Sequence, residues 1–180
     1  MGVEIQQLSF MFNCPPLENM YFVKWKIINK SSLNWDSTFF ALFNDADIGY
    51  GTCGASDDAA GCDTTSEMGF MYNGDNNDCN YGSNPPALGY RFLQSPLKFT
   101  GNNSDTAKLP YDTVIGYKLT GLNSYSIFRD WDQCQNHPDH AIYGYNFLRG
   151  KDGCGRDIIN PISGLPTNFN YDGDACGRSG

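Results

Sequence analysis

The chain has 180 residues, enough for one domain with a buried core, and a formal net charge of −8 at pH 7. This charge argues against nucleic acid or an anionic membrane surface as a partner, because binding to phosphate needs clustered lysine and arginine. Aromatic residues, glycine and proline are frequent and no apolar run approaches the ~20 residues that span a bilayer, so we expect a mainly β chain with many turns and no membrane span.

The first two predicted elements are β-strands. Residues 3 to 13 alternate loosely between apolar and polar side chains. Residues 20 to 29 give the clearest period of two, with apolar side chains from Tyr21 to Ile27 on one face and Lys24 and Lys26 on the other. This alternation predicts a half-buried antiparallel strand. A third β-prone run, residues 37 to 43, leads into an acidic segment.

The second half of the chain contains further short strands and one helix. Strands are predicted over residues 67 to 72, 88 to 93 and 97 to 100, and one or two more between 113 and 128, interrupted at Gly121. Near residues 138 to 149 the apolar spacing becomes three, and Pro138 and Gly150 suit the start and stop of a helix. We predict a single domain over residues 1 to 180: an antiparallel, jelly-roll-like β-sandwich with one short helix and long acidic loops.

The acidic segment between residues 44 and 78 is the strongest chemical signal. Its carboxylates, brought together in a fold, would repel one another unless a cation lay among them. Calcium prefers six to eight oxygen ligands of this kind. We therefore predict Ca²⁺ bound on Asp-rich loops, with a solvated acidic surface as the alternative. The predicted ligands are Asp45, Asp47, Asp57, Asp58, Asp63, Asn73, Asp75 and Asp78.

Two known binding motifs are only partly matched in this segment. The loop that begins at Asp45 opens like an EF-hand, but Tyr50 and Ser56 occupy the places of its glycine and its final glutamate. Residues 49 to 54 match G-x-G-x-x-G, yet a short acidic stretch follows where a dinucleotide site needs a helix. Any calcium site must therefore be assembled from separate loops.

Catalysis has little support in the sequence. The two histidines, His137 and His140, lack the further ligands of a zinc site, there is no G-x-S-x-G, and no pair of carboxylates stands out as a glycosidase pair. We expect no enzymatic activity, with a secreted hydrolase as the least favoured alternative.

Seven cysteines are spread along the chain without a C-x-x-C pair, which favours disulfides and an oxidising compartment. The odd number leaves at least one thiol unpaired within the chain. A bond between Cys53 and Cys62 would tie the acidic loop and is the first pair to examine. Several buried free thiols are the alternative.

Several segments together carry a family resemblance. They are Gly2–Gln7, Lys26–Ser32, Asp45–Gly49, Asp57–Asp58 through Gly61–Thr64, Tyr72–Asp75, Pro85–Tyr90 and Tyr171–Asp174. Over nearly its whole length the chain resembles an uncharacterised β-rich domain of large secreted bacterial proteins, which often end in a type IX secretion sorting domain. The family's domain usually continues past the last Gly-Asp motif, which suggests a fragment of a larger secreted protein. Cysteines such as Cys53, Cys79 and Cys176 depart from its pattern.

The resemblance implies location and architecture and brings no established activity. We expect a non-enzymatic extracellular structural or adhesive domain of the cell surface, stabilised by calcium and part of a surface fibre or assembly, with other copies of itself or glycans as further partners. The alternative is a carbohydrate-binding module. It would present an exposed row of aromatic rings such as Trp35 and Trp131, which could equally fill the core.

Overall fold

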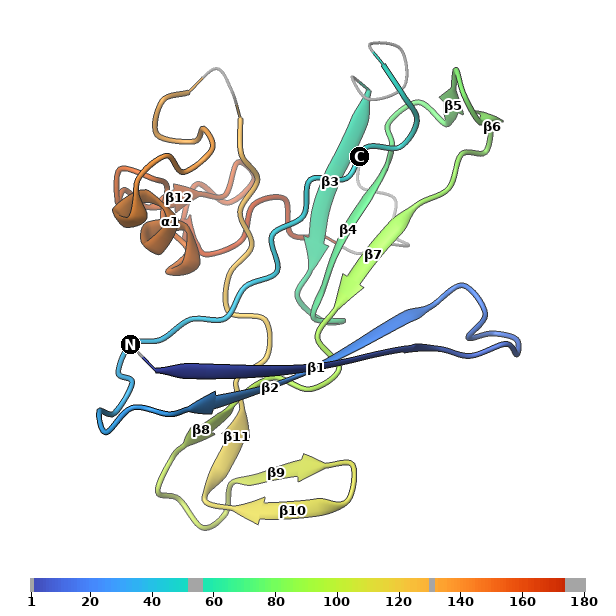
Figure 1. Ribbon diagram of the computed structural model, residues 1–180. Helices are drawn as coiled ribbons and strands as arrows, with labels where there is room; N and C mark the ends of the chain where they lie inside the picture. The colour runs from blue at the N-terminus through green and yellow to red at the C-terminus, as the bar shows by residue number, and fades with distance from the viewer. Residues whose placement is uncertain (1, 52–56, 130–131, 174–180) are drawn as a thin grey trace. The chain divides into compact units, whose positions relative to one another are not determined.

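The computed structural model describes residues 2–51, 57–129 and 132–173 (Figure 1). Its contacts divide the chain into two compact units, Met1–Thr38 and Phe39–Gly180. The expectation of one domain over the whole chain stays a prediction.

The N-terminal unit is a β-hairpin. Strands β1 (Val3–Met11) and β2 (Tyr21–Asn29) pair antiparallel over their full length, which confirms the two predicted strands. The alternation of apolar residues arises because successive side chains of a strand point to opposite faces. Phe10 stacks on Phe22 with ring centroids 5.2 Å apart, and the Trp25 indole donates a hydrogen bond to the Gln7 side chain.

The C-terminal unit contains one three-stranded sheet, in the order β3-β4-β7 (Figure 1). Its strands are β3 (Asp58–Asp63), β4 (Met68–Asn73) and β7 (Leu88–Arg91). The two-stranded sheets are β5 (Asn77–Asp78) with β6 (Gly82–Ser83), β8 (Leu97–Phe99) with β11 (Tyr117–Leu119), β9 (Thr106–Leu109) with β10 (Asp112–Ile115), and β12 (Ile158–Ile159) with β13 (Pro166–Thr167). Every pair of these described strands is antiparallel, so the mainly antiparallel β class is confirmed. The described sheets are small and separate, and the stacked sheets of a sandwich stay a prediction.

Three details of the strand predictions differ from the structure. Residues 58 to 63 were expected in a loop and instead form β3. Residues 37 to 43 were expected to be β-prone and form no described strand. The predicted break at Gly121 comes earlier, at Gly116, whose φ of +81° lies in the left-handed region and separates β10 from β11.

The short predicted helix is confirmed as α1 (Ala141–Leu148). It begins later than expected, because His140 is still extended and occupies the N-cap position, with Pro138 before it. Gly150, at φ +72°, follows the helix as predicted. Within the described ranges, no helix is both long and apolar enough to cross a membrane.

The C-terminal segment adds an edge to the three-stranded sheet. Cys62 and Asp172 form a parallel bridge, and Cys62 N–H donates to the Tyr171 carbonyl over 3.1 Å. Thr64 donates two hydrogen bonds to the Asp172 carboxylate through its N–H and its hydroxyl. This pairing buries Cys62 completely, at 0% exposure.

The cysteines confirm disulfide bonding and correct one pairing. Cys134 and Cys154 form a disulfide with Cα atoms 5.2 Å apart, and Cys79 is disulfide-bonded as well. Cys62 is a free thiol, so it does not pair with Cys53, which lies outside the described residues. The reason is its place in the middle of β3, where the C-terminal segment covers the sulfur.

Candidate functional site

The eight predicted calcium ligands fall into separate groups. Asp58 begins β3 and Asp63 ends it. Five steps at about 3.3 Å per residue place their Cα atoms roughly 16 Å apart. One ion therefore cannot contact both, and the two ends of β3 must be treated as different places.

The first group gathers where β3 begins and β4 ends. Asp58 lies opposite Asn73 in the β3–β4 register, and Asp57 is the residue before Asp58 in the chain. The Asn73 amide donates to Asp57 Oδ2 over 2.9 Å, and Gly74 N–H donates to the Asp57 carbonyl over 2.8 Å. Asn73 is only 5% exposed. Its hydrogen bond fixes the Asp57 carboxylate through Oδ2, and Asp57 Oδ1 takes no part in that bond.

Asp78, the last residue of β5, also belongs to this group. It is 1% exposed, and its Oδ1 accepts hydrogen bonds from the N–H groups of Asn80 and Tyr81, each 2.7 Å long. Its other oxygen, Oδ2, lies against Gly49, where a Cβ atom would clash with it. Gly49 also has a φ of +89°, so both its conformation and its closeness to Asp78 require glycine here.

The pKa of Asp58 reflects both its burial and the negative charges around it. Its Oδ2 accepts a hydrogen bond of 2.7 Å from Ile48 N–H. Burial raises the pKa of Asp58 above 3.8, the Ile48 hydrogen bond opposes this, and the charges of Asp57, Asp47 and Asp78 raise it further. The Ile48–Asp58 hydrogen bond and the closeness of Gly49 to Asp78 place the segment of residues 47 to 49 next to both the start of β3 and the end of β5. We call Asp47, Asp57, Asp58 and Asp78 the four-aspartate cluster.

The cluster contains three oxygens that the described residues leave without a hydrogen-bond partner. They are buried, and they are Asp57 Oδ1, Asp58 Oδ1 and Asp78 Oδ2. Burying a carboxylate oxygen unpaired costs several kcal/mol in stability unless a proton, a water or a cation satisfies it. Two of these atoms come from adjacent residues at the start of β3 and the third comes from Asp78 of β5, and together they are the chemical feature that marks this site.

The side chains of the four-aspartate cluster form no coordination shell in this structure. Across the described ranges, no group of three or more His, Cys, Asp or Glu side chains is arranged to hold a metal ion as it stands.

The remaining predicted ligands serve turns or point into solvent. Asp63 Oδ1 accepts hydrogen bonds from Thr65 and Ser66 N–H, and the Ser66 hydrogen bonds hold the pKa of Asp63 below its usual range. Asp75 Oδ1 accepts one from Asn77 N–H over 2.9 Å. Asp45 is exposed. The structure thus brings together four of the eight predicted residues, with Asn73 as their support.

The aromatic and histidine candidates are not brought together into a site. Trp131 lies outside the described residues, and Trp35 is half-buried in the N-terminal unit. His140 sits at the helix N-cap without a side-chain capping bond to any described residue, and the His137 ring lies 5.4 Å from that of Phe128.

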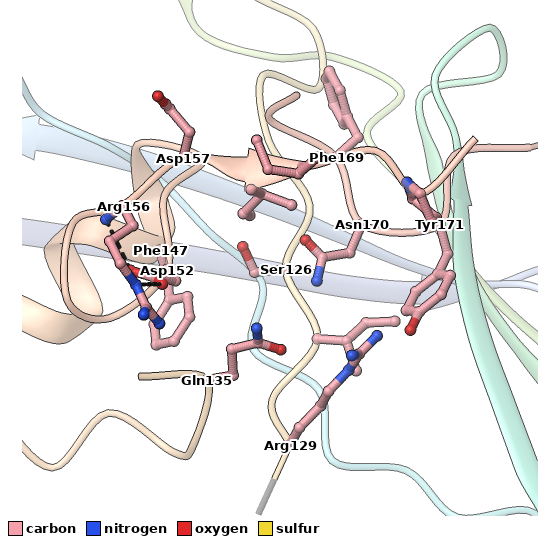
Figure 2. Close-up of a pocket in the computed structure, with 14 residues that line it drawn as sticks. Ser126, Arg129, Gln135, Phe147, Asp152, Arg156, Asp157, Phe169, Asn170 and Tyr171 are labelled. Carbon is pink, nitrogen blue, oxygen red and sulfur yellow. Dashed lines mark hydrogen bonds and ion pairs between the residues drawn. The ribbon is translucent and has the colours of Figure 1, made fainter. Parts of the chain in front are cut away.

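Sequence reasoning missed a second feature, a polar cavity near α1 (Figure 2). Ser126 and Asn170 line it, 44 residues apart in the chain, and only the paired backbone around Tyr125 and Phe169 brings them together. No local motif marks either residue, so no sequence signal could have found this cavity.

Comparisons with protein families, with curated proteins and with solved structures find no match. The resemblance to a secreted bacterial β-rich domain therefore stays a prediction.

Proposed function

We propose that the chain is a non-enzymatic extracellular structural or adhesive domain, a β-sandwich whose acidic loops are tied together by calcium. The observation that carries this proposal is that three carboxylate oxygens of the four-aspartate cluster are buried and have no hydrogen-bond partner among the described residues. Calcium would bridge three segments that otherwise repel one another: the loop around Ile48, the start of β3 and the end of β5.

The ligand chemistry supports calcium over other common metals. The cluster offers carboxylate oxygens and no histidine or cysteine, which soft and borderline metals such as zinc prefer. Magnesium demands a near-ideal octahedron, whereas calcium accepts six to eight oxygens in flexible geometry. Asp47 is exposed whereas Asp78 is buried, so an ion held by both could be reached from solvent and keep some of its waters.

The covalent chemistry supports an extracellular setting. The Cys134–Cys154 disulfide is of the kind that persists in oxidising compartments. The family resemblance in the sequence implies secretion and a place in a large surface protein. Both observations fit a structural domain that works outside the cell, within a fibre or assembly at the cell surface.

Calcium titration of two matched variants tests the proposal. Asp78→Asn removes the charge of the unpartnered oxygen and keeps an acceptor for Asn80 and Tyr81 N–H. Asp45→Asn makes the same chemical change at an exposed position. By isothermal titration calorimetry we expect the wild-type chain to bind calcium, Asp78→Asn to bind at least about tenfold more weakly, and Asp45→Asn to match wild type.

Folding of the variants is checked by thermal unfolding in EDTA. Asp78→Asn should unfold no earlier than wild type there, because it lowers the repulsion in the empty cluster. Calcium affinity that is equal in wild type and Asp78→Asn would contradict the site, and an absence of calcium binding to the wild-type chain would contradict the function.

A further inference from the structure

The C-terminal unit contains a cavity that the calcium proposal does not use (Figure 2). Its volume is about 460 Å³, within the roughly 300–1,000 Å³ of small-molecule sites. Aromatic walls come from Phe147 of α1, Phe169 and Tyr171. Polar side chains stand between them, among them Ser126, Asn170 and residues of the segment after the helix.

Backbone pairing puts two polar side chains next to each other on the cavity wall. Tyr125 and Phe169 form a parallel bridge, in which Tyr125 N–H donates to Asn168 and Asn170 N–H donates to Tyr125, each over 3.0 Å. Ser126 and Asn170 follow directly on the two bridged segments, as Figure 2 shows. Ser126 Oγ and Asn170 Oδ1 are both buried, and the described chain gives neither a hydrogen-bond partner.

An ion pair and a disulfide hold the opposite wall. The buried Asp152 carboxylate accepts a 2.9 Å hydrogen bond from Arg156 N–H and a 2.6 Å one from its guanidinium Nε. The Cys134–Cys154 disulfide closes the loop that carries Asp152, and Gly153 N–H donates to the Cys134 carbonyl over 2.7 Å. This wall is therefore built and rigid.

The charges that line the cavity cancel. Arg129 and Arg156 contribute two positive charges, and Asp152 and Asp157 contribute two negative ones. Asp157 is already paired with Lys151, and the Arg129 guanidinium lies over the Tyr171 ring at 5.0 Å from its centroid. A neutral polar ligand fits this lining better than an anion or a cation.

The two unpartnered groups specify what that ligand offers. A serine hydroxyl both donates and accepts, and an amide oxygen accepts, so together they match the hydroxyl groups of a polyol. Aromatic walls match the apolar face of a sugar ring. We propose that this cavity binds a neutral sugar unit of a glycan, held by Ser126 and Asn170 and packed against Tyr171. The proposal does not depend on calcium at the four-aspartate cluster.

Saturation-transfer NMR with sugars as probes tests the proposal, in calcium buffer so that both sites are in their working state. The probes are D-glucose, D-galactose, D-mannose and N-acetyl-D-glucosamine at millimolar concentration, with D-glucuronate as the charged counterpart. We expect transfer to the ring protons of at least one neutral sugar and weaker transfer to glucuronate.

Ser126→Ala is the decisive variant. It removes a buried hydroxyl that the described residues leave unsatisfied, so the melting temperature should stay equal or rise, while sugar affinity should fall about tenfold. Ser83→Ala makes the same change on exposed β6 and should leave affinity unchanged. Asn170→Ala should weaken binding to a similar degree.

Three results would overturn the proposal. These are no saturation transfer from any neutral sugar, preferential binding of glucuronate, and sugar binding that is equal in wild type, Ser126→Ala and Asn170→Ala.

Discussion

At the residue scale, the aspartates of this chain differ in how many of their carboxylate oxygens accept hydrogen bonds from neighbouring groups. Asp63 and Asp75 accept hydrogen bonds from backbone N–H groups two or three residues ahead, as short acidic side chains do in turns. Asp78 also caps a turn with one oxygen but buries the other without a partner among the described residues. The same residue type can thus shape a turn, offer an oxygen to an ion, or do both.

This division explains how much of the site the sequence could predict. The residue types and the acidic segment were sufficient to name all four members of the four-aspartate cluster as candidates. Sequence could not separate them from Asp63, because that requires knowing that residues 58 to 63 form an extended strand, which moves Asp63 to the far end. Nor could it place Gly49 against Asp78, a contact made across 29 residues.

The two free thiols of the described residues, Cys14 and Cys62, are predicted to differ strongly in reactivity. Cys14 is exposed, whereas burial raises the pKa of Cys62 to about 12, with the charges of Asp172 and Asp63 adding to the effect. The thiolate is the reactive form, so in native protein iodoacetamide should modify Cys14 and spare Cys62 until the chain unfolds. Peptide mass mapping measures this, and equal labelling of both in the native state would contradict the pairing of β3 with the C-terminal segment.

Asp105 is predicted to contribute stability that acid removes. The Lys118 ammonium, 2.9 Å from its carboxylate, and then the Thr100 hydroxyl hold the pKa of Asp105 below 3.8. A folded-state pKa below the unfolded value gives stability that is present above the unfolded pKa and is lost as pH falls through the folded pKa. Asp105→Asn should therefore lower the melting temperature by at most a few degrees at neutral pH, since exposed ion pairs contribute little, and flatten its decline as the pH falls below the unfolded pKa of about 3.9.

The control for this prediction is Asp36→Asn, the same charge change at an exposed position of the N-terminal unit. It should follow the wild-type pH profile. An Asp105→Asn profile that is parallel to wild type over the whole acid range would show that the Lys118 pair contributes nothing.

At the element scale, strands with strong alternation were predictable and strands of small residues were not. Residues 21 to 29 are rich in aromatic and β-branched side chains and show a period of two from Tyr21 to Ile27, and they form β2 as expected. Strand β3 reads Asp-Ala-Ala-Gly-Cys-Asp, which has low β-propensity and no alternation. It is a strand because β4 pairs with it on one edge and the C-terminal segment on the other. Tertiary pairing overrides local preference here.

The helix start illustrates the same limit. Proline and aspartate at 138 and 139 are typical of a first turn, yet the backbone stays extended through His140. The end of the helix was predictable, because helices commonly end at a residue of positive φ and glycine adopts this conformation without strain. Gly150 does so at φ +72°, and it also lies too close to Asn168 for a Cβ atom.

Loss of the Cys134–Cys154 disulfide is predicted to loosen the α1 region. The bond joins residues 20 apart, and closing a loop of this size contributes about 3 kcal/mol in the chain-entropy account. For a domain of this size that corresponds to a fall of roughly 6–12 °C in melting temperature. Scanning calorimetry of the double variant Cys134→Ser, Cys154→Ser measures it.

The control for the disulfide is Cys14→Ser, which removes an exposed free thiol and should leave the melting temperature unchanged. A double variant that melts together with wild type would mean that the disulfide loop is held by its other contacts. Hydrogen exchange across Ala141–Leu148 would then also match wild type.

At the scale of the whole molecule, the chain buries few apolar side chains for its composition. Hydrophobic residues make up 40% of the sequence, yet the buried ones in the described parts are Ile48, Cys62, Ala107 and Phe147. A small buried core gives limited stability from the hydrophobic effect. Disulfides and bound ions then contribute a larger share of the folding stability, and this is the role proposed for calcium.

The most direct test of this account is thermal unfolding under non-reducing conditions, once with excess calcium and once with EDTA. At a hundredfold excess over its dissociation constant, one bound ion stabilises the folded state by about 2.7 kcal/mol. For a chain of this length the account predicts a melting temperature roughly 5–11 °C lower in EDTA, restored by calcium and not by magnesium. An equal melting temperature in calcium and in EDTA would contradict it and would leave the four-aspartate cluster as a hydrated acidic pocket without a bound ion.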